Sequence, residues 1–134
     1  MFNLGVLLEE GDPDAARRWY EQAAAGGHAG AMFSLGGLLH DGDPDAARRW
    51  WEQAAEHGHA GAMFNLGVLL LNEGNRDAAR RSWEQAAAAG DTDAMKNLGV
   101  LLLNDGDRDA ARRWYEQAAA AGNTTARNNL GVIE

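Results

Sequence analysis

The sequence predicts an all-α solenoid, a stack of antiparallel helix pairs, from two observations: a short pattern recurs along the chain, and apolar residues within each copy fall at helical spacing. One pattern recurs along the chain, with copies near Met1, Met32, Met63, Met95 and Arg127 at intervals of 31, 31, 32 and 32 residues. A unit this short cannot bury its own apolar face, so the copies must stack, and about three are needed for stability. We therefore expect a single repeat domain, 1–134, with repeats at about 1–28, 29–59, 60–91 and 92–123 and a terminal helix at 124–134.

The first helix of each pair, called helix A, is predicted from the spacing of its apolar residues. In the second copy Met32, Leu35 and Leu39 fall at positions i, i+3 and i+7, which places them on one face of a helix. We expect this helix to run from about Ala29 to Asp41 and to end at Gly42.

The second helix of each pair, called helix B, is predicted from its ends. Asp43 is a typical N-cap and Pro44 a typical first helical residue. We expect helix B to run to about His57, with Gly58 as its C-cap. His59 then caps the next helix A, at a position where later copies have Asp91 and Asn123. Because the turns are short, helices A and B must be antiparallel neighbours.

Small and large residues recur at fixed positions of the pair. Each helix A has a glycine at the same register: Gly5, Gly36, Gly67, Gly99 and Gly131. A glycine inside a helix costs about 0.5–1 kcal/mol relative to alanine, so we expect a neighbouring backbone to approach closely there. One aromatic column of helix B is predicted to be core, and it comprises Tyr20, Trp51, Trp83 and Tyr115. The adjacent column is predicted to be half exposed, and it comprises Trp19, Trp50, Ser82 and Trp114.

The combined motif resembles the Sel-one-like repeat family, close relatives of the tetratricopeptide repeats. It consists of Asn-Leu-Gly in helix A, then Gly-Asp, Ala-Ala, Trp-Tyr, a second Ala-Ala and a closing glycine, and it covers essentially the whole chain. The resemblance implies a right-handed superhelix in which helix A lines the concave side, used as an adaptor in protein complexes. Copies one and two are one residue shorter at the A–B turn than copies three and four. The near-identity of the copies suggests recent duplication or deliberate construction, and the start inside repeat sequence suggests an excised or engineered segment.

Stacking turns the concave positions of helix A into columns. The first column reads Phe2, Phe33, Phe64, Lys96 and Asn128, and the second reads Asn3, Ser34, Asn65, Asn97 and Asn129. The third column reads Val6, Gly37, Val68, Val100 and Val132, and Leu71 and Leu103 extend this apolar strip. In tetratricopeptide relatives an Asn at the second column's position hydrogen-bonds the backbone of a bound peptide, so the resemblance implies the same role here.

These columns predict a groove for an extended or helical peptide, in which Phe rings provide affinity and Asn amides fix orientation. The predicted contacts are Phe2, Asn3, Phe33, Ser34, Phe64, Asn65, Val68, Leu71, Lys96, Asn97, Val100 and Asn129. The alternative for the Phe rings is packing between repeats. Acidic residues gather at the A–B turns, which favours a basic partner segment, while the apolar strip suits an apolar one.

Self-assembly is the competing function. Repeat arrays normally end in polar caps, whereas apolar residues lie at both ends of this chain: Met1, Phe2, Leu130, Val132 and Ile133. Head-to-tail contact would bury them and give homo-oligomers or open fibres. A third possibility is an engineered repeat chain with no partner.

Composition argues against other classes of function. The net charge of −8 disfavours nucleic-acid binding, and apolar runs such as 68–71 are far below the roughly 20 residues that span a bilayer. The Arg pairs lie three or four residues from Asp and Glu, which is typical of a solvated face. No cysteine is present, and His57 and His59 lack a third ligand at metal-site spacing, so we expect no metal, no cofactor and no enzyme activity. We expect a soluble chain, cytoplasmic if expressed as given; its compartment stays open.

Overall fold

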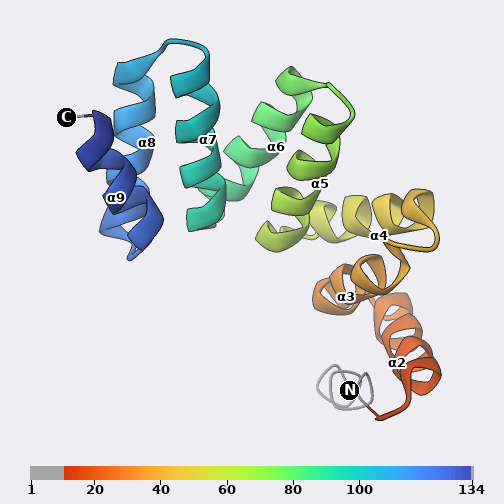
Figure 1. Cartoon of the computed structure of the whole chain (residues 1–134). Helices are drawn as coiled ribbons and strands as arrows, with labels where there is room; N and C mark the ends of the chain where they lie inside the picture. The colour runs from red at the N-terminus through yellow and green to blue at the C-terminus, as the bar shows by residue number, and fades with distance from the viewer. Residues whose placement is uncertain (1–10, 134) are drawn as a thin grey trace. The chain divides into compact units, whose positions relative to one another are not determined.

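The computed structural model describes residues 11–133, and within them every regular element is an α-helix (Figure 1). The predicted B helices are α2 (Pro13–Ala25), α4 (Pro44–Glu56), α6 (Arg76–Ala88) and α8 (Arg108–Ala120). The predicted A helices are α3 (Ala29–Leu39), α5 (Ala60–Asn72), α7 (Thr92–Asn104) and α9 (Thr124–Ile133). The alternation of A and B helices and the all-α fold class are therefore confirmed.

The chain divides into two compact units, Met1–Ala62 and Met63–Glu134, with the boundary inside α5. In the first unit α3 packs on both α2 and α4. In the second unit α7 packs on α6 and on α8, and α8 packs in turn on α9. Neighbouring helices within each unit are joined by short turns, as α7 and α8 show (Figure 1).

Each B helix begins at a side-chain N-cap, as the sequence predicts. The Asp43 carboxylate accepts a hydrogen bond from the Ala46 N–H at 3.1 Å, and Pro44 is the first residue of α4. Such a cap satisfies one of the four N–H groups that have no partner inside the helix. The equivalent caps of α2, α6 and α8 are Asp12, Asn75 and Asp107.

The turn from helix B to the next helix A is also the predicted one. Gly58 has φ +83°, a left-handed conformation that glycine adopts without steric cost. The His59 N–H bonds back to the Ala54 carbonyl at 3.1 Å, and the His59 Nδ1 atom accepts the Ala62 N–H at 3.2 Å. The loop of Gly58 and His59 therefore both ends α4 and caps the start of α5.

The turn from helix A to helix B exists in two forms. In α3 the helix ends at Leu39, two residues before the predicted Asp41, and the Asp43 N–H bonds the Leu39 carbonyl at 2.7 Å. In the longer copies, Gly74 and Gly106 have φ +87° and +90°. With the additional residue the glycine of this turn takes the left-handed conformation, and α5 and α7 are 13 residues long where α3 has 11.

The aromatic columns of helix B lie as predicted. Tyr20, Trp51, Trp83 and Tyr115 are at most 4% exposed. The adjacent column of Trp19, Trp50, Ser82 and Trp114 is half-buried. In the second unit the Trp83 ring belongs to a core cluster with Leu98 and Leu101 of α7.

Three of the recurring glycines, Gly36, Gly67 and Gly99, face side-chain rings, so the backbone neighbour predicted for them is wrong. A Cβ atom on Gly36 would overlap the Trp51 indole, and one on Gly67 would overlap the Trp83 indole. A Cβ on Gly99 would lie 2.6 Å from Cε1 of Tyr115. The glycine provides room for a large aromatic ring of the paired helix B, not for a second main chain.

Candidate functional site

The predicted groove residues are distributed over several helices and both units. Phe33 and Ser34 lie on α3 in the first unit, and both are half-buried. Of those in the second unit, Val68 and Val100 are exposed, at 36% and 40%. The remaining members there are half-buried: Phe64, Asn65, Leu71, Lys96, Asn97 and Asn129. Phe2 and Asn3 lie outside the described residues.

The two Phe rings make contacts within the fold. The Phe33 ring stacks on the imidazole of His59 with the ring centroids 4.7 Å apart, and the Phe33 carbonyl accepts the Trp51 Nε1–H at 3.1 Å. The Phe64 ring stacks on Trp83 at 6.4 Å, and its carbonyl accepts the Trp83 Nε1–H at 3.1 Å. Both Phe residues therefore help to hold helices together, which is the alternative that the sequence left open for them.

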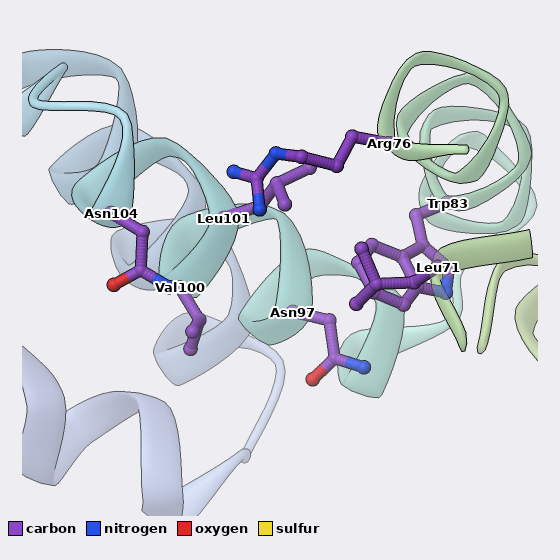
Figure 2. A pocket seen from close by; sticks show the side chains of 7 residues that line it. All are labelled: Leu71, Arg76, Trp83, Asn97, Val100, Leu101 and Asn104. Atoms are coloured by element: carbon purple, nitrogen blue, oxygen red, sulfur yellow. The ribbon is translucent and has the colours of Figure 1, made fainter. Parts of the chain in front are cut away.

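Three other predicted groove residues meet at one hollow in the second unit. Leu71 of α5 and Asn97 and Val100 of α7 line a cavity of about 210 Å³. Its remaining lining residues were not predicted as site residues: Arg76, Trp83, Leu101 and Asn104. Figure 2 shows Arg76 extending from α6 toward Leu101 on α7, with Asn97 and Val100 below it in the view.

The floor and the rim of this hollow differ in polarity. Trp83 and Leu101 are 3% and 4% exposed and belong to the core, so the hollow is built on a fixed apolar base. Asn97 and Asn104 add amides that can both donate and accept hydrogen bonds. The arrangement suits an apolar group held between polar ones.

A cation closes one side of the hollow. The Arg76 guanidinium pairs with the Asp105 carboxylate at the end of α7, and both side chains are about half exposed, at 47% and 48%. The sequence contained a usable signal for this residue, because Arg76 and Arg108 replace the prolines that begin α2 and α4. The pairing with Asp105 depends on how α6 and α7 pack, so spacing alone did not indicate it.

Helix α9 has one residue predicted to bind peptide, Asn129, and three predicted for self-association, Leu130, Val132 and Ile133. Asn129 on α9 hydrogen-bonds the Tyr115 hydroxyl; burial raises the pKa of that phenol, and this hydrogen bond partly offsets the shift. Leu130 is half-buried, Val132 is 81% exposed, and Ile133 is 6% exposed within the core that α8 and α9 share. Of the residues predicted for self-association, Met1 and Phe2 lie outside the described residues.

Two histidines and two of the paired arginines make local contacts. His57 Nδ1 lies 2.9 Å from the Gln53 carbonyl, and His59 Nδ1 caps α5. Arg17 pairs with Glu21 at 3.4 Å and Arg80 with Glu84 at 3.8 Å, all on solvated helix surface. Within residues 11–133, no three His, Asp or Glu side chains gather into a group that could hold a metal ion. None of the helices in that range is both long and apolar enough to cross a bilayer.

The defining pattern of the tetratricopeptide repeat matches residues 38–94 and 64–126, which together cover more than half of the 134 residues. The chain belongs to the tetratricopeptide repeat family. Residues 1–28 match the Sel1 repeat, so the Sel-one-like resemblance is confirmed as well. Repeats of both kinds are generally non-catalytic scaffolds for protein interactions. No curated protein matches the chain.

Solved structures agree with this assignment. A Sel1 repeat protein from Oxalobacter formigenes is 29% identical, with a TM-score of 0.86 over 98% of this chain and 61% of its own. A protective antigen of uropathogenic Escherichia coli strains, c5321, which displays an SLR fold, is 31% identical, with a TM-score of 0.85 over 98% of this chain and 32% of its own. This chain therefore spans less than two thirds of either relative. MamA, at 24% identity and a TM-score of 0.69 over 96% of this chain and 81% of its own, shows the fold alone.

Proposed function

We propose that this repeat protein is a non-catalytic scaffold that binds a peptide segment of another protein across the A helices of its second unit. The observation that carries the proposal is the hollow lined by Leu71, Asn97 and Val100, three residues that the sequence had predicted as peptide contacts. In this proposal the hollow receives one apolar side chain of the peptide. No chemistry, cofactor or nucleic acid takes part.

The size of the hollow supports a single side chain as occupant. Its volume is about 210 Å³, whereas a water molecule takes about 30 Å³ of liquid and pockets for drug-sized ligands start at about 300 Å³. A leucine or phenylalanine side chain of a bound peptide fits that range. The fixed apolar base of Trp83 and Leu101 would contact such a side chain without rearranging.

The rim supports recognition of the peptide backbone. Asn97 and Asn104 lie on the same helix at the hollow, and each amide can pair with a backbone N–H and a backbone carbonyl. Backbone pairing of this kind fixes the direction of an extended peptide, while the buried side chain provides most of the affinity.

Charge supports a basic flank on the peptide. The chain has a net charge of −8, so positively charged residues beside the apolar anchor would be attracted, and the attraction would weaken with salt. One buried apolar side chain contributes about 1.5–3 kcal/mol before ordering costs. We therefore expect affinities in the micromolar range or weaker.

A selection experiment tests the proposal. Random peptides displayed on phage are selected on the whole chain, and the dissociation constants of the enriched peptides are measured by fluorescence anisotropy. Val100→Glu places a charge on the exposed wall of the hollow, and Asn97→Ala removes a rim amide. Val132→Glu is the matched control, because Val132 is exposed at the equivalent register of α9 but does not line the hollow.

We expect Val100→Glu to weaken peptide binding about tenfold or more and Asn97→Ala to weaken it less, while Val132→Glu leaves it unchanged. Enriched peptides should have a large apolar residue next to Lys or Arg. Peptides that bind Val100→Glu as tightly as the unmodified chain would defeat the proposal.

Self-association is a second candidate, favoured by one observation. Val132 is 81% exposed and Leu130 is only half-buried, so apolar surface is open on the last helix. In this proposal copies associate head to tail through Leu130 and Val132, with Met1 and Phe2 on the facing copy, while Ile133 stays buried in the core of its own copy. Light scattering over a concentration series tests it: the apparent mass should rise with concentration and fall back in Val132→Glu. A constant monomer mass would contradict it.

A further inference from the structure

Two of the described A helices begin at a histidine. The Nδ1 atom of His28 accepts the Ala31 N–H in the first turn of α3, and the Nδ1 atom of His59 accepts the Ala62 N–H in the first turn of α5, both at 3.2 Å. An imidazole can accept a hydrogen bond only while it is neutral, because the protonated ring has two N–H donors and no acceptor. Protonation of the two rings therefore removes both caps.

The second unit makes the same caps with side chains of a different kind. Asp91 caps α7 and Asn123 caps α9, each with an oxygen 2.9 Å from the N–H of Ala94 or Ala126. A carboxyl group keeps an acceptor oxygen in either protonation state, and an amide does not titrate. The caps that a proton can remove thus lie in the first unit, and those that a proton leaves in place lie in the second.

The imidazole of His59 lies in a cluster with Phe33 and His28. The ring is half-buried and stacks on the Phe33 ring with the centroids 4.7 Å apart. Burial lowers the pKa of His59 below its ordinary 6.5, and the charge of His28 lowers it further. Below pH 6.5 the unfolded chain therefore takes up this proton more readily than the folded chain, and the folded state loses stability.

The surroundings of His59 provide no compensating negative charge. Helices α3 and α5 contain no ionisable side chain, and within residues 11–133 no carboxylate contributes to the pKa of His59. A cation at the start of α5 is also opposed by the helix dipole. The stack on Phe33 acts in the other direction, because an aromatic face attracts a cation, but this attraction is weak where the ring is partly solvated. The other ionisable groups on the adjoining segments are exposed: Glu21, His40, Glu52, Glu56 and His57.

The second unit has a carboxylate where the first unit has a glycine. Asp93 lies in the first turn of α7, and its Oδ1 atom accepts a side-chain N–H of Asn123 at 3.1 Å. The residue at the same register before His59 is Gly30 of α3. The cap of α9 therefore has an acidic neighbour on the preceding A helix, whereas the cap of α5 has none.

We propose that the first unit contains an acid-operated switch, in which protonation of His59 and His28 removes the N-caps of α5 and α3 and loosens α3 against α4. Phe33 connects the cluster to this helix contact, because its carbonyl accepts the Trp51 Nε1–H at 3.1 Å. Helices α7 and α9 keep their caps. The peptide hollow lies in the second unit, so either proposal can fail while the other holds.

Hydrogen exchange on the whole chain tests the switch. Amide exchange is followed by mass spectrometry at about pH 7.5 and about pH 5.5. Each rate is divided by the rate of the unfolded chain at the same pH, so that the direct effect of pH on the exchange chemistry cancels. We expect the protection of α3 to fall at least about tenfold in acid, while that of α7 changes less than about threefold.

Substitutions of histidine assign the effect to the caps. The double variant His28→Asn, His59→Asn replaces both rings by the amide that Asn123 uses, so α3 should stay equally protected at the two pH values. His57→Asn is the matched control in the same loop. The His57 Nδ1 atom lies 2.9 Å from the Gln53 carbonyl and caps no helix start, so this variant should keep the full acid sensitivity.

Gly30→Asp tests the charge itself. It supplies His59 with the carboxylate that Asp93 supplies to Asn123. A carboxylate beside the ring favours its protonated form, so the loss of protection in acid should shrink. A histidine that acted only through packing would not respond to this change.

Three results would overturn the proposal. One is an equal loss of protection in α3 and α7, since acid would then act on the whole chain. Another is an undiminished loss in the double variant, which would assign the effect to other groups. The third is a loss that Gly30→Asp leaves unchanged, which would show that the charge on His59 is not the trigger.

Discussion

The indole of Trp51 lies directly over Gly36, and its Nε1–H donates to the Phe33 carbonyl one turn earlier on α3. The glycine provides space for the ring, and the carbonyl fixes its orientation. The same pair of contacts recurs between α5 and α6, where Trp83 covers Gly67 and bonds the Phe64 carbonyl. This relationship makes the recurring glycine a requirement of packing, and the first prediction follows from it.

Gly36→Ala should destabilise the chain by about 1–3 kcal/mol, because the buried indole cannot move aside in a packed core. Gly131→Ala should have the opposite effect and stabilise the chain by about 0.5–1 kcal/mol, since alanine is the better helix former and its Cβ meets no atom of residues 11–133 within 4 Å. Urea denaturation followed by circular dichroism measures both. Equal effects at the two positions would show that the ring contact does not decide the outcome.

Trp83→Phe should lower the free energy of unfolding by about 0.5–1.5 kcal/mol, because the hydrogen bond to the Phe64 carbonyl is lost. The smaller packed area of the phenyl ring adds to this loss. Trp114→Phe is the control, a half-buried ring in the adjacent column. Its effect should be smaller in the same denaturation experiment. If the two substitutions cost the same, the Nε1 hydrogen bond contributes nothing to stability.

The thermal stability should fall in mildly acidic solution because of His59. Burial lowers the pKa of this imidazole below its ordinary 6.5, and the nearby His28 lowers it further. The folded state thus binds a proton less readily than the unfolded state, so the His59 contribution to stability is complete above pH 6.5 and is lost as the pH falls through the lower folded pKa. A protonated Nδ1 also cannot accept the Ala62 N–H that caps α5.

The check is a melting curve at intervals from pH 7.5 to about pH 5. His59→Asn should flatten the decline, because Asn123 performs the same cap on α9 with an amide that does not titrate there, accepting the Ala126 N–H at 2.9 Å. A decline of the same steepness in the variant would assign the effect to other groups.

Arg76→Met should change stability by no more than about 1 kcal/mol, because its ion pair with Asp105 is half exposed to solvent. The difference between the variant and the unmodified chain should shrink as salt is raised, since screening weakens only the charged pair. Denaturation at low and high sodium chloride measures it. A large difference that persists at high salt would contradict the view that the exposed ion pair accounts for the effect of Arg76.

The local structure followed from short-range chemistry. Asp43 and Pro44 specify a helix start wherever they occur together, and Gly58 specifies the stop, because capping and left-handed φ are properties of a few adjacent residues. The predicted end of α3 at Asp41 was wrong by two residues, because the helix ends at Leu39. No glycine in this turn adopts the left-handed conformation that marks the end of α2 and of α4 to α8.

The candidate site was predictable only in part. Leu71, Asn97 and Val100 were predicted because repeat columns put equivalent residues on one face, and all three line the hollow, although their role as peptide contacts stays a prediction. The rings of Phe33 and Phe64, predicted on the same face, stack on His59 and Trp83. Arg76 was missed because its place at the hollow depends on the contact between α6 and α7.

By itself the sequence determined the helix pairs, their order, their caps and the burial of the aromatic column, because each depends on a residue's own preferences or on a period that every copy repeats. Only the tertiary structure decided which side chain fills the space above Gly36, Gly67 and Gly99 and which residues line the hollow. Those facts depend on how neighbouring helices meet, and side-chain directions across such a contact are set by packing and not by spacing along the chain.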